Sequence, residues 1–458
     1  MTDNLLFAYY GDDLTGSTDA MEALGLSGVR TALFLEPPSE DDLTGRFSNL
    51  QAVGVAGRSR SMTPAQMDDV LPVHFQQLGD LDPPLVQYKV CSTFDSSPDV
   101  GSIGHAIDLA QAEFDSPFVP LAVGVPALQR YVVFGHLFAT ADGFTYRIDR
   151  HPTMSEHPVT PMTESDLGRH LGQQTDRGVE RFTVLDLEDD GVDTAFARVV
   201  GSHPEIVMFD TINASHLQTV GRLVWTHAVE SRDQPMFAVG SSGLDYALAS
   251  YWNRIGAVSP PESTPVADSV DQIAVMSGSA SPETAAQIEA ALDSDSFVGV
   301  RLDTPTLVTS DAQEERKRAI TETLSALELG KSVILYSARG PNDSALQRTR
   351  EAAADTEQVE DVGARLGREQ GRIFRRILLE HELSRVCIAG GDTSGHVAPA
   401  LDIFALEFES PVAPGTPLCV ASSTDDRFDR LEIALKGGQT GSEQFFENVR
   451  RGYSDHWP

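Results

Sequence analysis

The sequence predicts an α/β protein with two α/β domains whose largely parallel sheets face each other across a cleft. Three observations support this fold class. Short apolar runs alternate with helical patterns along most of the chain, and loops of Gly, Ser, Thr and Asp follow several of these runs. A length of 458 residues also exceeds what a single hydrophobic core commonly supports.

The N-terminal stretch organises the rest of the prediction. An apolar strand at residues 5–10 precedes a loop at residues 11–19, and a helix is expected from Ala20 onward. This order places backbone N–H groups at the carboxyl edge of a sheet. The adjacent carboxylates of Asp12 and Asp13 can hold Mg²⁺, accept a hydroxyl proton or bind a polyol. The same residue types also cap helices and form turns, so both interpretations stay open.

The alternation of strands and helices continues through the first half. Helices are expected from Pro64 onward and over residues 100–113. A hairpin over residues 131–148 and a proline-containing loop at residues 150–158 interrupt the pattern. Further strands are expected at residues 30–35, 52–56, 85–91, 118–125, 182–186, 206–210 and 236–239.

A domain boundary is expected near the middle of the chain. Residues 256–270 are rich in Pro, Ser and Gly and lack apolar periodicity, which predicts a linker between domains at 1–255 and 271–458. The second domain repeats the alternation. Its expected strands lie at residues 272–276, 332–336, 385–389 and 431–434, and its expected helices at residues 282–292, 366–380 and 396–404.

Three glycine-containing loops follow expected strands of the second domain, at residues 277–281, 390–395 and 436–441. Glycine lets the backbone approach phosphate oxygens closely, and a helix N-terminus adds partial positive charge. None of the loops has Walker A spacing. Tight turns use the same residues, but three such loops in one domain favour phosphate or nucleotide binding.

The first domain offers a different set of polar side chains at its expected strand ends. The carboxyl ends of parallel strands converge on one edge of the sheet, where ligands bind. Carboxylates bind hydroxyl groups, and Arg with Lys binds a carboxylate. A small polyhydroxy acid suits this mixture. The residues are Asp12, Asp13, Arg60, Lys89, Ser92 and Asp95.

Composition excludes several classes of partner. The 68 acidic and 34 basic residues give a formal net charge of −34, which argues against nucleic acid or an anionic membrane as a partner. Such acidity suits a salt-rich cytoplasm. Three widely spaced cysteines without a CxxC pair predict a reducing, cytoplasmic setting without disulfides or a zinc site. We expect no signal peptide and no membrane span.

Taken in order, six short motifs resemble those of the four-carbon acid sugar kinases, the family of threonate, erythronate and 3-oxo-tetronate kinases. The resemblance covers nearly the whole chain. It implies an N-terminal α/β domain that binds the acid sugar, a C-terminal α/β domain that binds ATP, and phosphoryl transfer between them. The motifs are GDDLTG at 11–16, KVCSTFDS at 89–96, VGSSGL at 239–244, SGSAS at 277–281, GGDTSG at 390–395 and KGGQTG at 436–441.

The resemblance also implies roles for individual residues. Substrate-side positions correspond to Asp12, Asp13, Arg60, Lys89 and Ser92, with either of the first two as the catalytic base. Nucleotide-side positions correspond to Ser279, Gly390, Gly391, Asp392, Thr393, Gly437 and Gly438.

One stretch departs from the family pattern. Residues 91–96 are Cys-Ser-Thr-Phe-Asp-Ser, where the commoner family pattern is Asp-Ser-Thr-Leu-Arg-Gly. Asp95 stands where the family pattern has arginine, so a positive charge is lost at this position. This loss points to a branched or oxidised acid sugar rather than a simple tetronate. The loop around Arg150 is a candidate for replacement contacts.

The main hypothesis is therefore a kinase that uses ATP and Mg²⁺ to phosphorylate a hydroxyl group of a small sugar acid. An aspartate-nucleophile phosphatase is an alternative, but the usual DxD spacing is missing and the glycine-rich second half would have no role. A non-catalytic sensor of nucleotide and sugar acid is a third hypothesis. The residues leave the metal ligands and the oligomeric state open, with a homodimer as one candidate.

Overall fold

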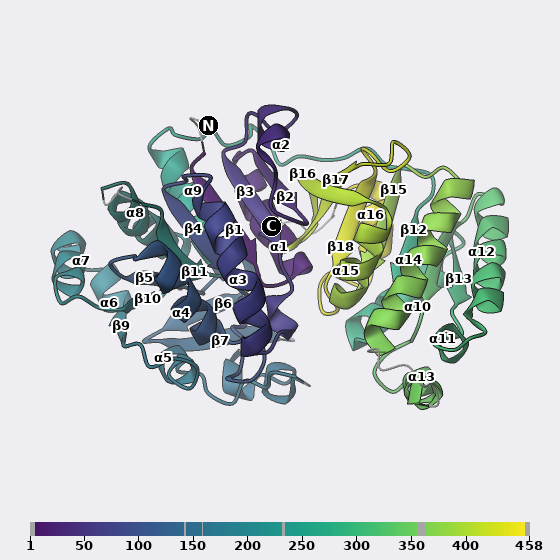
Figure 1. The fold of residues 1–458 in the computed structure, drawn as a ribbon, viewed down its shortest axis with the longest axis horizontal. Coiled ribbons are helices and arrows are strands. Elements are labelled where there is room, and N and C mark those ends of the chain that lie inside the picture. The colour runs from purple at the N-terminus through teal and green to yellow at the C-terminus, as the bar shows by residue number, and fades with distance from the viewer. Residues whose placement is uncertain (1–4, 142, 158, 231–233, 355–361, 454–458) are drawn as a thin grey trace. The chain divides into compact units, whose positions relative to one another are not determined.

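The computed structural model describes residues 5–141, 143–157, 159–230, 234–354 and 362–453. The chain divides into two units, Met1–Glu262 and Ser263–Pro458 (Figure 1). Each unit is an α/β domain in which helices cover a largely parallel sheet, so the predicted fold class of two such domains is confirmed. The division between the units falls inside the predicted linker at residues 256–270.

The described strands of the N-terminal sheet follow the order β2-β3-β1-β4-β11-β5-β10-β9, and their pairings are parallel. Gly11 is level with Ala56 and Lys89, and Lys89 is level with Gly240. Four strands therefore end together at one edge. The bounds are β1 Phe7–Gly11, β2 Thr31–Phe34, β3 Ala52–Ala56, β4 Leu85–Lys89, β5 Val119–Ala122, β9 Val179–Phe182, β10 Ile206–Phe209 and β11 Met236–Gly240.

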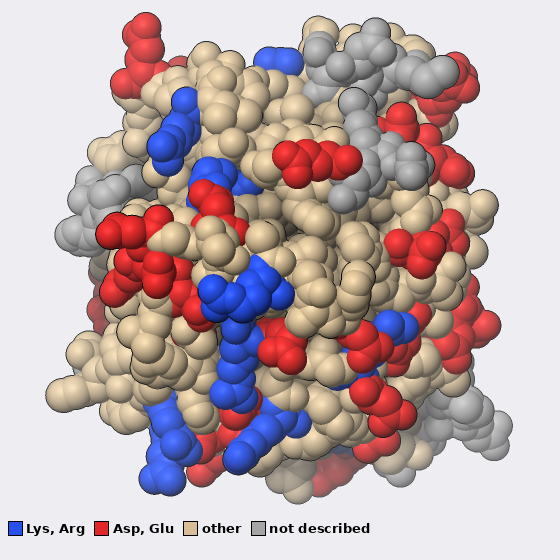
Figure 2. Space-filling view, turned by 90° about the vertical axis from the view of Figure 1, so that its left-hand side faces the viewer, with Lys and Arg blue, Asp and Glu red and all other residues tan. Residues whose placement is uncertain are grey.

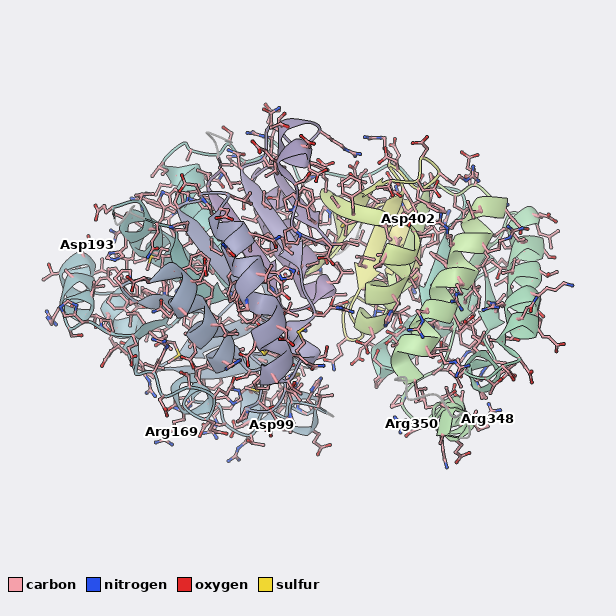
Figure 3. The ribbon with its side chains drawn as sticks, in the orientation of Figure 1. Asp99, Arg169, Asp193, Arg348, Arg350 and Asp402 are labelled. Carbon is pink, nitrogen blue, oxygen red and sulfur yellow. The ribbon has the colours of Figure 1, made fainter. Side chains whose placement is uncertain are left out.

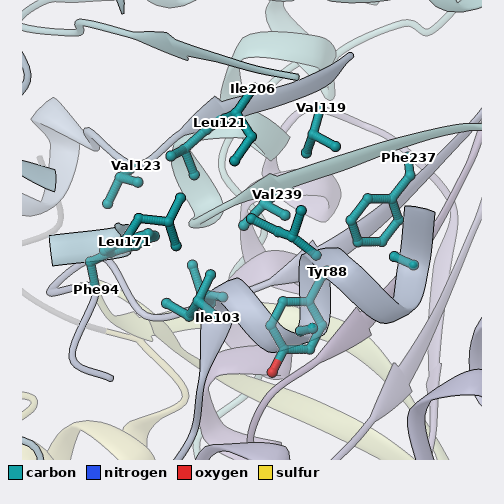
Figure 4. Close-up of a cluster of buried hydrophobic side chains, with 14 of the residues drawn as sticks. Tyr88, Phe94, Ile103, Val119, Leu121, Val123, Leu171, Ile206, Phe237 and Val239 are labelled. Atoms are coloured by element: carbon teal, nitrogen blue, oxygen red, sulfur yellow. The ribbon is translucent and has the colours of Figure 1, made fainter. Parts of the chain in front are cut away.

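Helices pack on both faces of this sheet because successive strand residues point to opposite sides. On one face, the Phe7 ring lies 6.0 Å from the Trp252 ring of α9. On the other, Tyr10 and Tyr88 join the apolar cluster of Figure 4, to which α3 and α4 contribute. The helices are α1 Leu14–Leu26, α2 Glu40–Thr44, α3 Pro64–Gly79, α4 Ile103–Phe114, α5 Leu167–Leu171, α6 Val184–Leu187, α7 Val192–Val200, α8 Ala214–Glu230 and α9 Ser242–Arg254.

The expected hairpin at residues 131–148 is a three-stranded antiparallel sheet. Its strands are β6 Arg130–Val133, β7 His136–Ala141 and β8 Phe144–Arg147, in the order β6-β7-β8. Two short 3-10 turns follow at Ile148–Arg150 and Met154–Glu156. Pro158, the last residue of the predicted proline-containing loop, lies outside the described residues.

Three sequence predictions place elements wrongly. Helix α1 begins at Leu14 rather than Ala20, because the Asp13 side chain accepts the Gly16 N–H and caps the helix. The predicted strand at 182–186 ends at Phe182, and α6 follows it, capped by a Thr183 and Asp186 pair. The helix predicted at 396–404 is α15, Gly391–Ala400, followed by a strand.

The C-terminal sheet follows the order β13-β14-β12-β15-β18-β17-β16 among the described strands. It is parallel from β13 to β18, and β16, β17 and β18 pair antiparallel. The strands are β12 Ala274–Ser277, β13 Phe297–Arg301, β14 Ser332–Tyr336, β15 Arg385–Ala389, β16 Ile403–Ala413, β17 Thr416–Ser423 and β18 Glu432–Lys436. The helices are α10 Pro282–Leu292, α11 Thr304–Leu307, α12 Ala312–Glu328, α13 Ser344–Ala354, α14 Val362–Glu380, α15 Gly391–Ala400 and α16 Phe445–Arg451.

Helices α8 and α9 of the N-terminal unit approach each other closely, and a mutation can test this packing. A Cβ atom at Gly221 in α8 would lie 1.9 Å from the Ala247 carbonyl oxygen in α9. The helices would have to separate, so we expect Gly221→Ala to lower the free energy of unfolding by about 1–3 kcal/mol. Urea unfolding followed by circular dichroism measures this. An unchanged unfolding midpoint would contradict the close packing.

Candidate active site

Two carboxylates and one guanidinium group meet at the carboxyl edge of the N-terminal sheet. Asp12 follows β1, and Arg60 lies in the 3-10 turn Ser59–Ser61 after β3. Arg60 binds both oxygens of Asp12, with Nε–Oδ2 at 3.1 Å and Nη2–Oδ1 at 2.7 Å. Its Nη2 also lies 3.0 Å from Asp13 Oδ1. The structure thus brings together the predicted residues Asp12, Asp13 and Arg60.

The two aspartates have different surroundings. Burial raises the pKa of Asp12 to about 6, although Arg60 acts against this rise. Asp13 is more exposed and holds the start of α1, since its carboxylate accepts the Gly16 N–H at 2.8 Å and the Thr15 hydroxyl at 2.7 Å. A carboxyl group with a pKa near neutrality, such as that of Asp12, is suited to accept a proton.

Lys89 at the end of β4 is buried beside two acidic side chains. Its Nζ lies 3.3 Å from Asp19 Oδ2 in α1 and donates to the Val90 carbonyl oxygen at 3.1 Å. Burial alone would lower the Lys89 pKa, but Asp19, Asp12 and Asp245 raise it above its ordinary value. Burial raises the pKa of Asp245 in α9 to about 7. The charge of Lys89 therefore offsets part of the negative charge that is buried at this edge.

The loop after β4 carries the remaining predicted substrate-side residues. Ser92 is buried there, and the Asp95 carboxylate accepts hydrogen bonds from the Thr93 and Thr160 hydroxyls. Burial alone would raise the Asp95 pKa, but Arg60 and Thr93 lower it below its usual value. Asp95 is thus a charged group already satisfied by the protein. The departure from the family pattern at this position places a negative charge beside Arg60.

The loop predicted to supply replacement contacts contributes only in part. His157 Nδ1 lies 3.0 Å from the Thr160 hydroxyl, and a charge on His157 would lower the Asp95 pKa. Arg150, by contrast, has an exposed side chain whose Nε lies 3.9 Å from Asp149 Oδ2.

Three turns converge at the carboxyl edge of the C-terminal sheet, because Ser277, Ala389 and Lys436 are level with one another. Gly390 has φ of +122°, and a Cβ atom there would lie 2.9 Å from Thr393 Oγ1 and 3.2 Å from the Ser279 nitrogen. A Cβ atom at Gly438 would lie 3.3 Å from Ser279 Oγ. Ser279, Gly390, Thr393 and Gly438 therefore form one cradle.

The remaining predicted nucleotide-side residues flank this cradle. Gly391 and Asp392 are exposed in the first turn of α15, and a Cβ atom at Gly391 would meet no atom within 4 Å. Gly437 accepts a hydrogen bond from Lys436 Nζ at 2.8 Å. Lys436 Nζ also donates to Thr284 Oγ1 and Gly438 O, and burial lowers its pKa to about 8. Lys436 thus holds the turn in place.

Sequence reasoning missed several side chains that complete the N-terminal site. Asp19 and Asp245 lie inside helices, where acidic residues are ordinarily solvent-facing, and Thr160 lies 65 residues from its partner Asp95. The VGSSGL motif, which ends one residue before Asp245, was the available signal for that residue. Nothing in the local pattern marks Asp19 or Thr160.

Two family models match the chain in succession. A sugar-binding N-terminal domain matches residues 7–248, and a nucleotide-binding C-terminal domain matches residues 274–446. The 3-oxo-isoapionate kinase of Paraburkholderia graminis is 47% identical over 98% of this chain and 94% of its own length. The chain belongs to the four-carbon acid sugar kinase family.

Further relatives agree with this assignment. The 3-oxo-tetronate kinase of Pseudomonas fluorescens is 28% identical to this family member over 97% of the chain and 96% of the relative. A crystal structure of a Salmonella typhimurium protein, 24% identical, has the same fold with a TM-score of 0.75 over 98% of this chain and 99% of that one. This four-carbon acid sugar kinase is an ATP-dependent enzyme acting on a sugar acid, which favours the kinase hypothesis over the phosphatase and sensor alternatives.

Two kinds of feature are absent from the described residues of the kinase. No helix in them combines the length and apolar character needed to cross a bilayer. The same residues contain no group of three or more His, Cys, Asp or Glu side chains arranged to hold a metal ion.

Proposed function

We propose that this kinase transfers the terminal phosphoryl group of ATP to a hydroxyl group of an oxidised sugar acid related to 3-oxo-isoapionate. The observation that carries this choice is the 47% identity, over 98% of the chain, to a 3-oxo-isoapionate kinase. The loop at 91–96 supports it, because Cys91 and Asp95 depart from the pattern expected of a simple tetronate kinase.

On the substrate side, Asp12 is the proposed general base. Its carboxylate takes the proton of the attacking hydroxyl as the oxygen bonds to the γ-phosphorus and the bond to the departing ADP oxygen breaks. Arg60 orients Asp12 through two hydrogen bonds, and Asp13 holds the turn by capping α1. Ser92 and Lys89 shape the same edge, with Lys89 neutralising its buried acids.

On the nucleotide side, the cradle of Ser279, Gly390, Thr393 and Gly438 is the proposed phosphate site. The absence of side chains at the glycines allows phosphate oxygens to approach backbone N–H groups. A Mg²⁺ ion fits here, since Asp392 is exposed beside the cradle and Mg²⁺ needs only one or two carboxylates when phosphates are bound. Bound Mg²⁺ would supply charge neutralisation on the phosphates.

Release of ADP, measured with a panel of acids, tests this function. We expect 3-oxo-isoapionate to give a higher kcat/KM than 3-oxo-tetronate, and both to exceed threonate and erythronate. Assays at low and high KCl measure how salt screening changes the rate of ADP release by a chain of net charge −34. ADP release that does not depend on any of these acids would reject the proposed substrate class.

A further inference from the structure

Arg130 lies at the same edge of the N-terminal sheet as the proposed substrate site. It begins β6, and it pairs as an isolated antiparallel bridge with Val125, which closely follows β5. Burial lowers the Arg130 pKa, and a charge on Cys91, in the loop after β4, acts against this lowering. The strand register places both residues at one edge of the sheet, because Ala122 at the end of β5 is level with Gly240 of β11, and Gly240 is level with Lys89, two residues before Cys91.

The guanidinium group of Arg130 is only partly satisfied by the protein. Its Nη1 donates to the carbonyl oxygens of Leu128, at 2.8 Å, and Gln129, at 3.4 Å. Its Nε is buried without a hydrogen-bond partner among the described residues. An unsatisfied buried donor is destabilising unless a ligand accepts its hydrogen bond. The Nε–Nη2 edge is also the edge that binds a carboxylate through two parallel hydrogen bonds.

Other arginines of the N-terminal unit have carboxylate partners. Arg177 lies 2.6 Å from Asp108, and Arg181 lies 2.6 Å from Asp166. Figure 2 shows the same tendency on one face of the molecule, where many blue basic side chains lie beside red acidic ones. Within the described part of the chain, no carboxylate pairs with Arg130.

The two cations already assigned to the site have acidic partners of their own. Arg60 binds Asp12 and Asp13, and Lys89 contacts Asp19. An acid entering this edge therefore meets more negative than positive charge unless another cation faces it. The negative groups are Asp12, Asp13, Asp19, Asp95 and Asp245, and the positive groups already paired are Arg60 and Lys89.

From these contacts we infer that Arg130 binds the carboxylate of the sugar acid through its Nε–Nη2 edge. The main-chain carbonyls at Nη1 fix the orientation of the guanidinium group, so the edge is held ready for the acid. This inference rests on the proposed function, because it requires a carboxylate substrate. It assigns acid recognition to Arg130 and leaves Arg60 to orient Asp12.

A comparison of charged and neutral substrates tests the role of Arg130. Initial rates would be measured for 3-oxo-isoapionate and for its primary amide, with wild type, Arg130→Gln, Arg130→Lys and the control Arg147→Gln. Arg147 lies in β8 of the same small sheet, but its exposed side chain pairs with Asp149. We expect Arg130→Gln to raise KM for the acid about 10- to 100-fold and to leave KM for the amide within twofold.

The lysine variant separates charge from geometry. Arg130→Lys keeps the positive charge but loses the planar fork, so its KM for the acid should lie between those of the wild type and Arg130→Gln. Arg147→Gln should match the wild type. Equal acid-to-amide discrimination in wild type and Arg130→Gln would overturn the inference. If Arg130→Gln does not fold, a wild-type KM for the acid in Arg130→Lys would overturn it instead.

Failure of the proposed function is a separate result. If the wild type releases no ADP with 3-oxo-isoapionate, that substrate is wrong, whatever the variants do. Calorimetric titration of wild type and Arg130→Gln with erythronate, which carries the same carboxylate group, then tests Arg130 directly. A binding constant that Arg130→Gln weakens at least 10-fold supports the inference, and equal binding overturns it.

Discussion

Replacement of Asp12 by Asn should lower kcat by a factor of about 10² to 10⁴, because the amide cannot accept the proton of the attacking hydroxyl. The wild-type enzyme should lose activity as the pH falls through about 6, the pKa to which burial raises Asp12. Below that pH the carboxyl group is protonated and cannot act as a base. The acid limb of the profile should disappear in the variant, as measured by kcat/KM between pH 5 and 8.

The same pKa predicts that the Asp12 variant stays folded. A carboxyl group whose pKa is raised in the folded state binds its proton more tightly there than in the unfolded chain. Ionisation of Asp12 therefore lowers stability as the pH rises from about 4 to about 6, and this loss persists at higher pH. The neutral amide avoids that loss, so the melting temperature at pH 7 should not fall.

Asp193 provides a matched control for this charge removal. It lies on α7, and its side chain is 71% exposed beside Arg222 (Figure 3). Asp193→Asn makes the same chemical change away from the site and should keep wild-type kcat. An Asp12→Asn enzyme with wild-type kcat and an unchanged acid limb would remove Asp12 from the mechanism. Asp13→Asn should have a smaller effect, since Asn is also a good helix cap.

Replacement of Gly390 by Ala should raise KM for ATP at least 10-fold. Its φ of +122° is a backbone conformation that only glycine adopts readily, and the added Cβ would lie 2.9 Å from Thr393 Oγ1. Relief of this strain, about 1–3 kcal/mol, must move the turn that forms the proposed phosphate cradle. ADP release at varied ATP concentration, together with calorimetric titration of the nucleotide, measures the effect.

Gly330 is a suitable control for backbone strain alone. It also has a positive φ, +78°, and a Cβ atom there would meet nothing within 4 Å. It follows α12 and precedes β14, so it lies at the opposite end of that strand from the cradle. Gly330→Ala should lose some stability and keep the wild-type KM for ATP. Equal KM values for ATP in both variants would contradict a role of Gly390 in nucleotide binding.

Much of the fold follows from the sequence because buried parallel strands are short apolar runs between turn residues. The strands at 52–56, 332–336 and 385–389 match their predicted bounds. The start of a helix is harder to predict than a buried strand where glycine and small polar residues fill the first turn. Gly16 in α1 and Gly391 in α15 resemble loop residues. Both nevertheless lie in the first turn of a helix that begins just after a parallel strand ends.

The candidate site is less accessible to sequence reasoning for a physical reason. Residues that directly follow strands, such as Asp12 and Ser279, are expected at the carboxyl edge by the topology alone. Asp19 reaches this edge because its side chain packs against Lys89. Arg130 reaches it because the chain reverses direction after β5. Their positions depend on tertiary contacts that no local pattern specifies.

The position of β11 has a consequence for biosynthesis. This strand, the last of the N-terminal sheet in the chain, inserts between β4 and β5. A nascent chain that has emerged only as far as residue 230 can pair β2, β3, β1 and β4, and separately β5, β10 and β9, but it cannot join the two groups. Ribosome-bound chains should therefore resist proteolysis only after residue 240 has left the exit tunnel.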